Sequence, residues 1–343
     1  MTRLSDVAQA AGVHPGTASR ALNPETRHRV SAETVRRVLA VAESLGYQPN
    51  SVARALRTRR SRMVAILIPD LTNPLFPPIV RGVEEALAVA GYSALLVSTD
   101  NDEDKEARLF AELRGRQCDG FVVATARRDH PLLERAAAEG VPMVLVNRVL
   151  DSGLTPSVTA DEAAGVDAVV RHLTGLGHRR IAHLAGPQEL STGLIRRRTF
   201  LDSCEQAGLD PRHTPVVDAT GFSEAAGTAA MDRLLSTHRG PERPTAVFAA
   251  NDLLALGALD ALAASGLRCP EDMSVAGFND MPFLTRMTPP LTTVHVPQQE
   301  IGAEAARMLL TCIAEPGPPR SLLLGCALVV RASTGPAPTT RGE

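Results

Sequence analysis

Arginine side chains dominate the first 62 residues and could bind a polyanion. This segment holds 11 Arg and four acidic residues, a net charge of +7, whereas residues 63–343 carry a net charge of −9. Guanidinium groups form paired hydrogen bonds with phosphate oxygens, and cationic side chains displace counterions from nucleic acids. A basic head followed by an acidic body indicates a polyanion-binding module joined to a part that does not bind polyanions.

Patterns typical of enzymes and metal sites fail at particular positions. Lys105 is the only lysine, which excludes a P-loop lysine and disfavours Schiff-base chemistry. The acidic run 100–104 begins like a calcium loop, but Lys105 and Ala111 stand where glycine and glutamate are needed, so we interpret it as a helix N-terminus. His172, His178 and His183 lack metal-ligand spacing. The five cysteines are an odd number and widely spaced, and no Gly-x-Ser-x-Gly elbow occurs. We therefore predict no enzyme activity, metal, cofactor or disulfide framework.

Three short helices are expected to position the arginines of the head. Apolar residues recur every three or four positions from Leu4 to Ala11, and Gly12 permits a turn. A second helix is predicted over 14–22, with Pro15 in its first turn, and a third after Ser31. This order is typical of a helix-turn-helix unit, whose second helix enters the major groove of DNA. A three-helix bundle without a nucleic-acid role is the alternative, which the clustered arginines disfavour.

The head also carries a long ordered motif. It reads Leu4-x-Asp-Val-Ala-x-x-Ala-Gly-Val-x-x-x-Thr-x-Ser-Arg-x-Leu-Asn23, followed by Val30-Ser, Leu45-Gly-Tyr-x-Pro-Asn50 and Ala53-Arg-x-Leu56. This motif resembles the DNA-binding head and hinge of the LacI/GalR family of bacterial repressors. The resemblance implies that DNA is contacted by Pro15, Gly16, Thr17, Ser19, Arg20, Asn23, Ala53, Arg54, Leu56 and Arg57.

The resemblance also implies a role for each of these contacts. Thr17 and Ser19 would hold phosphates, Arg20 would read a guanine edge, and Asn23 would anchor the helix end. Pro15 and Gly16 occupy positions where relatives vary the side chains that choose the operator. Neither offers a side-chain hydrogen bond, so Arg20 should carry more of the readout. His14 stands where relatives commonly have a serine that can cap the helix.

The segment 50–57 is similar to the hinge helix of that family, which orders on operator DNA. Leu56 would be the apolar wedge in the minor groove, with Arg54 and Arg57 beside it. Eight residues are too few for a stable isolated helix, so folding coupled to DNA binding is physically reasonable. An ordinary linker is the alternative interpretation.

From Met63 onward, apolar runs alternate with amphipathic helices, which predicts parallel sheets covered by helices. The predicted strands are 64–68, 93–97, 120–123, 143–146, 181–184, 246–248 and 274–276. Two similar half-sheets in tandem indicate two α/β lobes that face each other across a cleft. The fold class predicted for the chain is thus an all-α helix-turn-helix head followed by an α/β core of two parallel-sheet lobes.

The family resemblance continues to about Thr334, with markers such as Pro69-Asp-x-x-Asn-Pro-x-Phe76, Ala250-Asn-Asp252 and Ser274-Val-Ala-Gly-Phe-Asn-Asp280. It implies a core similar to a periplasmic binding protein, in which the chain crosses between lobes three times. The domains expected are a DNA-binding domain (1–48), a hinge and linker (49–62) and an effector-binding and dimerisation domain (63–334). Its first lobe would comprise about 63–160 and 290–318, and its second about 161–289 and 319–334. We expect the tail 335–343 to be disordered.

Ligands in such folds bind between the lobes, at the carboxyl ends of the strands. The positions that match the family's effector pocket are Asn73, Phe76, Asn147, Arg196, Phe222, Asn251 and Asn279. Amides, a guanidinium and phenyl rings suit a polyol. The alternative roles are helix caps for Asn73 and Asn251, core packing for the two Phe, and a surface charge for Arg196.

Two further positions bear on the ligand class. Many sugar-binding relatives have an aspartate where this chain has Asn279, so a neutral polyol, a sugar phosphate and a purine-like compound all stay open. Leu190 stands where purine-responsive relatives carry an arginine. The resemblance therefore favours a sugar or sugar derivative as the effector.

Together these features predict a homodimeric transcriptional repressor that binds a double-stranded DNA operator. No apolar run approaches the roughly 20 residues that span a bilayer, and nothing resembles an export signal, so we expect a cytoplasmic protein without membrane contact. The tail lacks the leucine heptads that make some relatives tetramers. The alternatives are a global catabolite-type regulator that responds to a phosphorylated protein partner, a sugar-binding protein without a DNA role, and an enzyme that uses the cleft.

Overall fold

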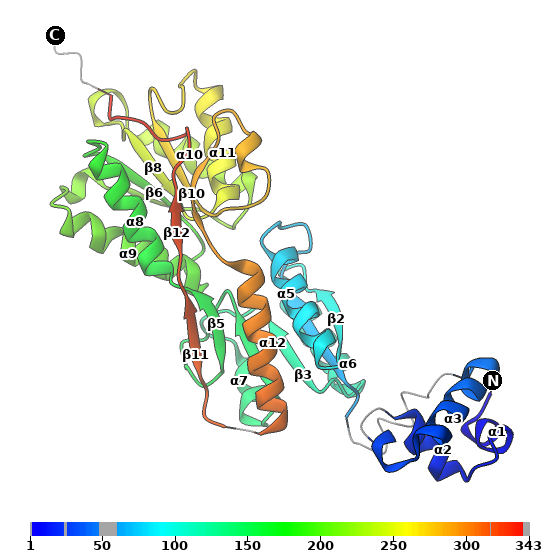
Figure 1. The fold of residues 1–343 in the computed structure, drawn as a ribbon. Coiled ribbons are helices and arrows are strands. Elements are labelled where there is room, and N and C mark those ends of the chain that lie inside the picture. The colour runs from blue at the N-terminus through cyan, green and yellow to red at the C-terminus, as the bar shows by residue number, and fades with distance from the viewer. Residues whose placement is uncertain (1, 24–25, 48–59, 316, 339–343) are drawn as a thin grey trace. The chain divides into compact units, whose positions relative to one another are not determined.

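The computed structural model describes residues 2–23, 26–47, 60–315 and 317–338. The chain forms two compact units, residues 1–62 (the head) and 63–343 (the body) (Figure 1). This division falls where the amino-acid pattern changes from the arginine-rich segment to alternating apolar runs.

Three helices and one short 3-10 turn form the described part of the head. They are α1 (Leu4–Ala10), α2 (Pro15–Leu22), η1 (Arg27–Arg29) and α3 (Ala32–Ser44). Val7, Ala18 and Val38 pack together in its core. Gly12, with φ +64°, makes the turn between α1 and α2, a conformation that glycine adopts without steric cost. The hydroxyl of Ser31 accepts a hydrogen bond from the Thr34 amide (3.3 Å) and caps α3. The three predicted helices are confirmed.

The first lobe of the body is built on a six-stranded, wholly parallel sheet in the order β11-β5-β4-β3-β1-β2. Its strands are β1 (Met63–Ile68), β2 (Ser93–Ser98), β3 (Gly120–Val123), β4 (Met143–Val146), β5 (Ser157–Ala160) and β11 (Ser321–Leu324). The helices α5 (Phe76–Val89) and α12 (Gln298–Ala314) cover one face, and α6 (Glu103–Gly115) and α7 (Pro131–Ala138) cover the other. Both faces of β1 are therefore buried, which explains its unbroken apolar run.

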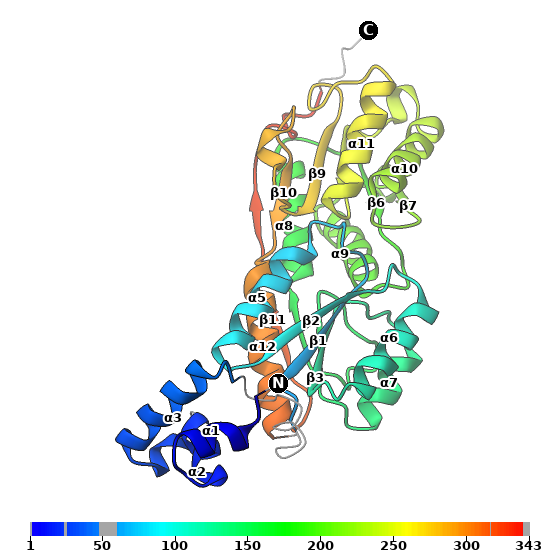
Figure 2. The same ribbon diagram turned by 90° about the vertical axis from the view of Figure 1, so that its right-hand side faces the viewer.

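The second lobe contains a sheet in the order β12-β10-β9-β8-β6-β7. Its strands are β6 (Ile181–Ala185), β7 (Val216–Asp218), β8 (Ala246–Ala249), β9 (Ser274–Asn279), β10 (Thr292–His295) and β12 (Ala327–Val329). The helices α8 (Glu162–Gly175) and α9 (Ser191–Gln206) cover one face, and α10 (Glu224–Thr237) and α11 (Asp252–Ala264) cover the other (Figure 2). Three 3-10 turns lie in the loops: η2 (Pro211–His213), η3 (Gly240–Glu242) and η4 (Leu284–Arg286). The fold is that predicted, except that β12 runs antiparallel to β10.

The predicted lobe boundaries near the C-terminus are wrong. We expected residues 290–318 in the first lobe and 319–334 in the second, but β10 (292–295) pairs with β9 in the second sheet and β11 (321–324) pairs with β5 in the first. The chain thus crosses between β5 and α8, between β10 and α12, and between β11 and β12 (Figure 1). Two threonines make β10 poor in apolar residues, and β11 lies at the edge of its sheet, so neither strand was recognised from the sequence.

The seven predicted strands are confirmed, and five others escaped prediction. The missed strands are β5, β7, β10, β11 and β12. Hydroxyl residues interrupt β5 and β10, whereas β7, β11 and β12 lie at the edges of their sheets and are partly exposed. β5 (Ser-Val-Thr-Ala) and β10 (Thr-Thr-Val-His) have few apolar residues, and the apolar residues of β7, β11 and β12 lie in short edge strands, which are harder to recognise.

Helices α5 and α12 approach each other closely because glycines lie at their contact. A Cβ atom on Gly82 would stand 1.9 Å from the backbone oxygen of Gln299, and one on Gly302 would stand 2.0 Å from that of Ile79. Any side chain at either position would force the two helices apart. The contact fixes the start of α12, which lies beside the second lobe.

The tail is ordered further than expected. The Gly335 amide donates to the Ser274 hydroxyl (3.1 Å), the Gly335 carbonyl bonds His178 (3.0 Å), and the Ala337 amide donates to the Leu176 carbonyl (2.9 Å). The prediction of a disordered tail is therefore wrong for residues 335–338, because these backbone groups find partners on the second lobe. Residues 339–343 lie outside the described part.

Among the described helices, none is long and apolar enough to cross a membrane.

Candidate functional site

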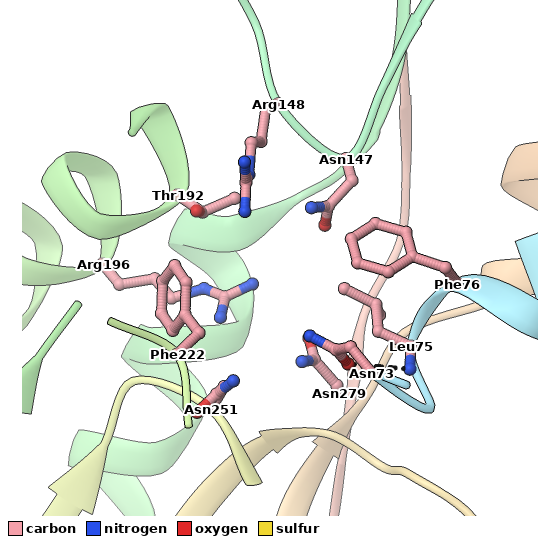
Figure 3. A pocket seen from close by; sticks show the side chains of 10 residues that line it. All are labelled: Asn73, Leu75, Phe76, Asn147, Arg148, Thr192, Arg196, Phe222, Asn251 and Asn279. Carbon is pink, nitrogen blue, oxygen red and sulfur yellow. Dashed lines mark hydrogen bonds between the residues drawn. The ribbon is translucent and has the colours of Figure 1, made fainter. Parts of the chain in front are cut away.

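A pocket lies between the two lobes of the body, where the carboxyl ends of parallel strands from both sheets face each other (Figure 3). Its lining residues are Asn73, Leu75, Phe76, Asn147, Arg148, Thr192, Arg196, Phe222, Asn251 and Asn279. The structure thus brings together all seven predicted effector-binding residues. Leu75, Arg148 and Thr192 were not predicted.

The topology of the sheets explains why residues so distant in sequence meet. Asn73 to Phe76 follow β1, Asn147 and Arg148 follow β4, and Thr192 and Arg196 lie on α9 after β6. Phe222 follows β7, Asn251 follows β8, and Asn279 ends β9. Each segment leaves a strand at its carboxyl end, which is where parallel sheets place their ligand sites.

Arg196 is a buried, paired side chain rather than a surface charge. Its Nε and Nη2 bond both carboxylate oxygens of Glu162, the first residue of α8, and its Nη1 donates to the carbonyl oxygen of Ala250. The guanidinium also stacks on Phe278, 3.9 Å from the ring centre. Three of its five N–H groups are thereby satisfied within the described residues, and Glu162 neutralises its charge. Glu162 was missed because it lies 34 residues earlier in the chain.

One of the pocket asparagines, Asn251, also caps a helix, as the alternative interpretation proposed, whereas Asn73 forms an Asx turn before α5, whose N-cap is Leu75. The Oδ1 atom of Asn251 accepts from the Leu254 amide (2.9 Å) at the start of α11. The Oδ1 atom of Asn73 accepts from the Leu75 amide (3.0 Å) just before α5. Their amide groups still line the pocket. The two interpretations are therefore compatible: the oxygen stabilises the backbone and the NH₂ group remains available as a donor.

The other two asparagines occupy backbone conformations that few residues adopt. Asn147 has φ +63° and Asn279 has φ +116°. Asparagine tolerates positive φ better than most side chains, so the backbone partly explains both residues. The Oδ1 atom of Asn279 is nevertheless buried without a hydrogen-bond partner in the described part of the chain. This orphaned acceptor is evidence of a binding role beyond the turn.

The two phenyl rings lie on opposite sides of the pocket in Figure 3. Phe76 is only 1% exposed and belongs to the core between α5 and the first sheet, so it has a packing role as well. Phe222 is half-buried and packs on Gly186, where a Cβ atom would stand 2.3 Å from the ring. Glycine at position 186 is therefore needed to let the Phe222 ring close this side of the pocket.

Arg148 and Thr192 are the polar residues that sequence reasoning missed. Arg148 is 7% exposed and points into the pocket toward Thr192 and Arg196 (Figure 3). Its Nε atom and the Thr192 hydroxyl have no hydrogen-bond partner among the described residues. Burial lowers the pKa of Arg148 to about 10. An arginine directly after a buried strand is a signal that could have found it.

Contacts between the lobes nearly close the cleft on the side of Arg128. The Arg128 amide donates to the Glu189 carbonyl (2.9 Å), and the Val149 amide donates to the Ser191 hydroxyl (3.0 Å). The pocket is small: the centre of a water molecule can move through only about 20 Å³ of it, so it holds one or two waters. A larger ligand can enter only if the lobes separate.

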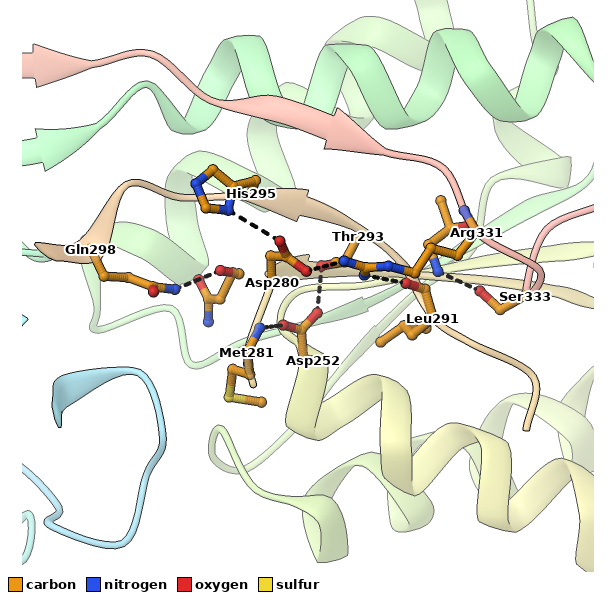
Figure 4. A network of polar contacts seen from close by, with 11 residues as sticks. Asp252, Asp280, Met281, Leu291, Thr293, His295, Gln298, Arg331 and Ser333 are labelled. Carbon is orange, nitrogen blue, oxygen red and sulfur yellow. Dashed lines mark hydrogen bonds and ion pairs between the residues drawn. The ribbon is translucent and has the colours of Figure 1, made fainter. Parts of the chain in front are cut away.

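A partly buried polar network lies next to the pocket, where β9, β10 and β12 meet (Figure 4). Asp280, which follows Asn279, binds Arg331 (2.6 Å) and His295 (3.1 Å). Asp252 accepts hydrogen bonds from the Thr293 hydroxyl and the Met281 amide, and burial raises its pKa to about 7. These bonds fix the backbone of Asn279 relative to β10 and β12, the two strands next to which the chain crosses between the lobes.

The second helix of the head presents the predicted DNA-contacting residues. Ala18 and Ala21 are fully buried, whereas Pro15 and Arg20 are exposed, and Gly16, Thr17, Ser19 and Asn23 are half-buried. The Nε atom of Arg20 donates to the Gly16 carbonyl (3.0 Å). This bond lays the side chain along α2 and leaves its terminal NH₂ groups to meet another partner.

The imidazole of His14 takes the place of a serine cap. Its Nδ1 atom accepts a hydrogen bond from the Gly16 amide (3.1 Å), and α2 begins at Pro15.

One arginine of the head also has a structural role, since the Nε atom of Arg37 donates to the Ala11 carbonyl (3.0 Å) at the helix turn. The predicted hinge contacts Ala53, Arg54, Leu56 and Arg57 lie outside the described residues.

The rejected sites have ordinary structural explanations. Asp102 caps α6 by accepting from the Lys105 amide (2.8 Å), so the acidic run is a helix N-terminus as predicted. His172 bonds Thr334, His178 bonds Thr245, and His183 bonds the Phe248 carbonyl, stacked between two phenyl rings. Among the described residues, no group of three His, Cys, Asp or Glu side chains could hold a metal ion.

Both units match known proteins. Residues 3–50 match the bacterial regulatory proteins of the lacI family, and residues 170–334 match a periplasmic binding protein-like domain. The chain is 34% identical over 344 residues to the HTH-type transcriptional regulator DegA of Bacillus subtilis (strain 168), covering 98% of this chain and 99% of that protein.

Two solved structures are similar over nearly the whole chain. One is the lac repressor dimer bound to operator and the anti-inducer ONPF, with a TM-score of 0.86 and 27% identity over 97% of this chain and 99% of that one. The other is a complex of the transcriptional regulator CelR with cellobiose, with a TM-score of 0.72 and 34% identity over 97% of this chain and 100% of that one.

Proposed function

Because this chain belongs to the lacI family of bacterial regulatory proteins, we propose that it is a dimeric transcriptional repressor whose affinity for a DNA operator depends on a small effector, a sugar or sugar derivative, bound between the two lobes. The observation that carries this proposal is the pairing of a helix-turn-helix head of net charge +7 with a pocket into which nine polar or aromatic side chains from both lobes converge.

The DNA contacts are divided between two segments. On α2, Thr17 and Ser19 bind phosphates and Arg20 reads a base edge, while Pro15, Gly16 and Asn23 set the approach of the helix. Exposure of Arg20 beside buried Ala18 and Ala21 supports this assignment. In the hinge, Ala53, Arg54, Leu56 and Arg57 bind the minor groove. One head makes too few base contacts alone, so two heads of a dimer bind a near-palindromic operator.

A sugar or sugar derivative suits the pocket because its donors and acceptors match hydroxyl groups. The amides of Asn73, Asn147 and Asn251 line it, and the rings of Phe76 and Phe222 can pack on an apolar sugar face. The similar regulator CelR has been solved with cellobiose, which supports the same ligand class here. The residues act by binding, so we assign the chain no catalytic step, and a DNA operator implies that it works in the cytoplasm.

The regulatory step is a change in lobe separation. In the nearly closed pocket, a sugar-sized molecule has no room, so binding must favour a different spacing of the lobes. The spacing of the lobes sets the separation of the two hinges in the dimer. To reverse operator occupancy almost completely, the effector must bind one state about 5.5 kcal/mol better than the other.

The experiment that tests this proposal begins with the purified full-length protein. Genomic fragments that it retains are selected at moderate salt, and metabolites of the neighbouring pathways are then screened for release or tightening of the complex. We expect one fragment class to bind at least 1,000-fold tighter than random DNA, about the lower limit for specific binding. Equal binding to every fragment, or an operator complex that no metabolite alters, would contradict the proposal. Sedimentation of a tetramer would contradict the dimer.

A further inference from the structure

We propose that the effector is an anionic sugar derivative, a compound with hydroxyl groups and one phosphate or carboxylate, and that Arg148 is the residue that binds its anionic group. This inference rests on the proposed function, because it assigns the chemical class of the ligand to the same pocket.

The first argument is the state of Arg148 itself. Its side chain is more than nine-tenths buried and points into the pocket, yet no ion pair joins it to a carboxylate in the described part of the chain. Its Nε atom also has no hydrogen-bond partner there. Burying a guanidinium without partners costs free energy, which an anionic ligand would offset by bonding its donors.

The second argument is the balance of charge around the pocket. The ten described lining residues include two arginines and no acidic residue. Glu162 forms two hydrogen bonds with Arg196 and compensates that charge. Glu106 and Glu189 act on Arg148 only through longer-range attraction, and burial raises the pKa of Glu106, which favours its neutral form. No carboxylate in the pocket lining therefore pairs with the charge of Arg148.

The third argument is the helix end beside Arg148. Thr192 is the second residue of α9, a helix of 16 residues, so the positive end of the helix dipole lies at the pocket wall. Leu190 at the N-cap offers no side-chain hydrogen bond to the first amides of α9. The Thr192 hydroxyl is buried without a partner among the described residues. Arg148 and Thr192 thus leave unused donors at the same end of the pocket.

The opposite end of the pocket suits the hydroxyl groups of the same ligand. There the orphaned Oδ1 atom of Asn279 is a buried acceptor, and Asn73 contributes an amide nearby (Figure 3). An acceptor of this kind needs a hydroxyl donor, and a fully ionised phosphate or carboxylate has none. The two ends therefore require different groups on one molecule, which separates this ligand class from both inorganic anions and neutral sugars.

The test is calorimetric titration of full-length wild type, Arg148→Gln and Arg198→Gln. Two series of ligands are titrated, each with a neutral sugar, its phosphate and its carboxylate. The first is glucose, glucose 6-phosphate and glucuronate, and the second is ribose, ribose 5-phosphate and ribonate. A separate experiment probes the anion subsite alone. The thermal unfolding temperature of each protein is measured with inorganic phosphate or acetate and compared with its value in chloride at equal ionic strength. Arg198→Gln removes the same charge from an exposed position on α9 and serves as the control.

We expect an anionic form to bind about tenfold or more tightly than its neutral parent. Arg148→Gln should abolish this preference and any stabilisation by phosphate or acetate, and Arg198→Gln should keep both. Whether the phosphate or the carboxylate form binds identifies the anionic group. Because the guanidinium forms no hydrogen bond or ion pair with another described residue, Arg148→Gln should unfold at the same urea concentration as wild type or higher, so lost binding cannot be attributed to misfolding.

The inference is overturned if the neutral parent binds as tightly as both anionic forms, if Arg148→Gln retains the anion preference, or if neither anionic sugars nor inorganic anions interact with the wild type. Its failure is distinguishable from failure of the proposed function. Operator release by a neutral sugar would refute the anionic class and leave a sugar-responsive repressor, whereas an operator complex indifferent to every small molecule would refute both.

Discussion

The side-chain amide of Gln298 donates a hydrogen bond to the backbone carbonyl oxygen of Asn279 over 2.6 Å (Figure 4). Gln298 begins α12 of the first lobe, and Asn279 ends β9 of the second and lines the pocket. Both residues are buried. One bond therefore joins the pocket directly to the element that crosses between the lobes.

Gln298→Ala should weaken the coupling between effector and operator. Without this bond, a displacement of Asn279 is transmitted less well to α12, and we expect the coupling free energy to fall by about 0.5–2 kcal/mol. Operator affinity measured with and without effector gives this quantity. Gln299→Ala is the matched control, because its amide bonds Glu85 within the first lobe (2.9 Å). Equal effects of the two substitutions would contradict the assigned role.

Arg196→Ala should destabilise the body as well as abolish the effector response. It leaves the carboxylate of Glu162 buried without its two hydrogen bonds, which typically costs about 3–5 kcal/mol of unfolding free energy. Urea unfolding measures this loss. The double variant Arg196→Met, Glu162→Gln should recover most of the stability without the response. A double variant as unstable as the single one would show that the ion pair is not the cause.

Arg20→Ala should remove operator preference and keep salt-sensitive binding to random DNA. The expected loss is about 1–3 kcal/mol for the base contact that Arg20 provides. Competition between operator and random duplexes at several salt concentrations measures both properties. Arg36→Ala removes an exposed charge from α3 and should weaken both kinds of binding alike. Preference retained in Arg20→Ala would refute the base-reading role.

Asp252→Asn should stabilise the protein at alkaline pH. Burial raises the folded-state pKa of Asp252 to about 7, above its unfolded value of 3.8, so the carboxyl group favours folding only while protonated. Wild type therefore loses stability as the pH rises from about 4 to 7. The amide can keep both bonds, to the Met281 amide and the Thr293 hydroxyl.

Urea unfolding across pH 4–8.5 checks this prediction. The variant should exceed wild type by on the order of 2–4 kcal/mol above pH 7, and the difference should shrink toward zero near pH 4. A difference that did not vary with pH would mean that Asp252 is not the titrating group.

Gly82→Ala should destabilise the first lobe by about 1–3 kcal/mol through overpacking, because the added methyl group meets the backbone of α12 at 1.9 Å. Thermal unfolding is the measurement. Gly115→Ala, in α6, is the control: nothing lies within 4 Å of its Cβ position, and a gain of about 0.4–1 kcal/mol is expected. Equal behaviour of the two variants would indicate that α5 and α12 can separate freely.

Local pattern was sufficient for much of the fold. Gly12, the cap at Ser31 and buried runs such as Val64–Ile68 depend on residues only a few positions apart, and the structure has the elements that they predict. Seven of the ten pocket residues were also found from sequence, because a parallel sheet gathers the carboxyl ends of its strands whatever the loops between them contain. β10 has few apolar residues and β11 is a partly exposed edge strand, so neither was recognised, and the lobe boundaries were misplaced accordingly.

Pairing of charges was decided only by the tertiary structure. Arg196 lies within α9 and Arg148 follows β4, and both line the pocket. Arg196 meets Glu162 and the Ala250 carbonyl, 34 and 54 residues away, whereas Arg148 meets no carboxylate among the described residues. The sequence by itself placed Arg196 in the pocket and did not indicate Arg148. Which of them is neutralised depends on distances of a few ångströms between distant segments, because hydrogen bonds and ion pairs act only at that range, and those distances are set by packing alone.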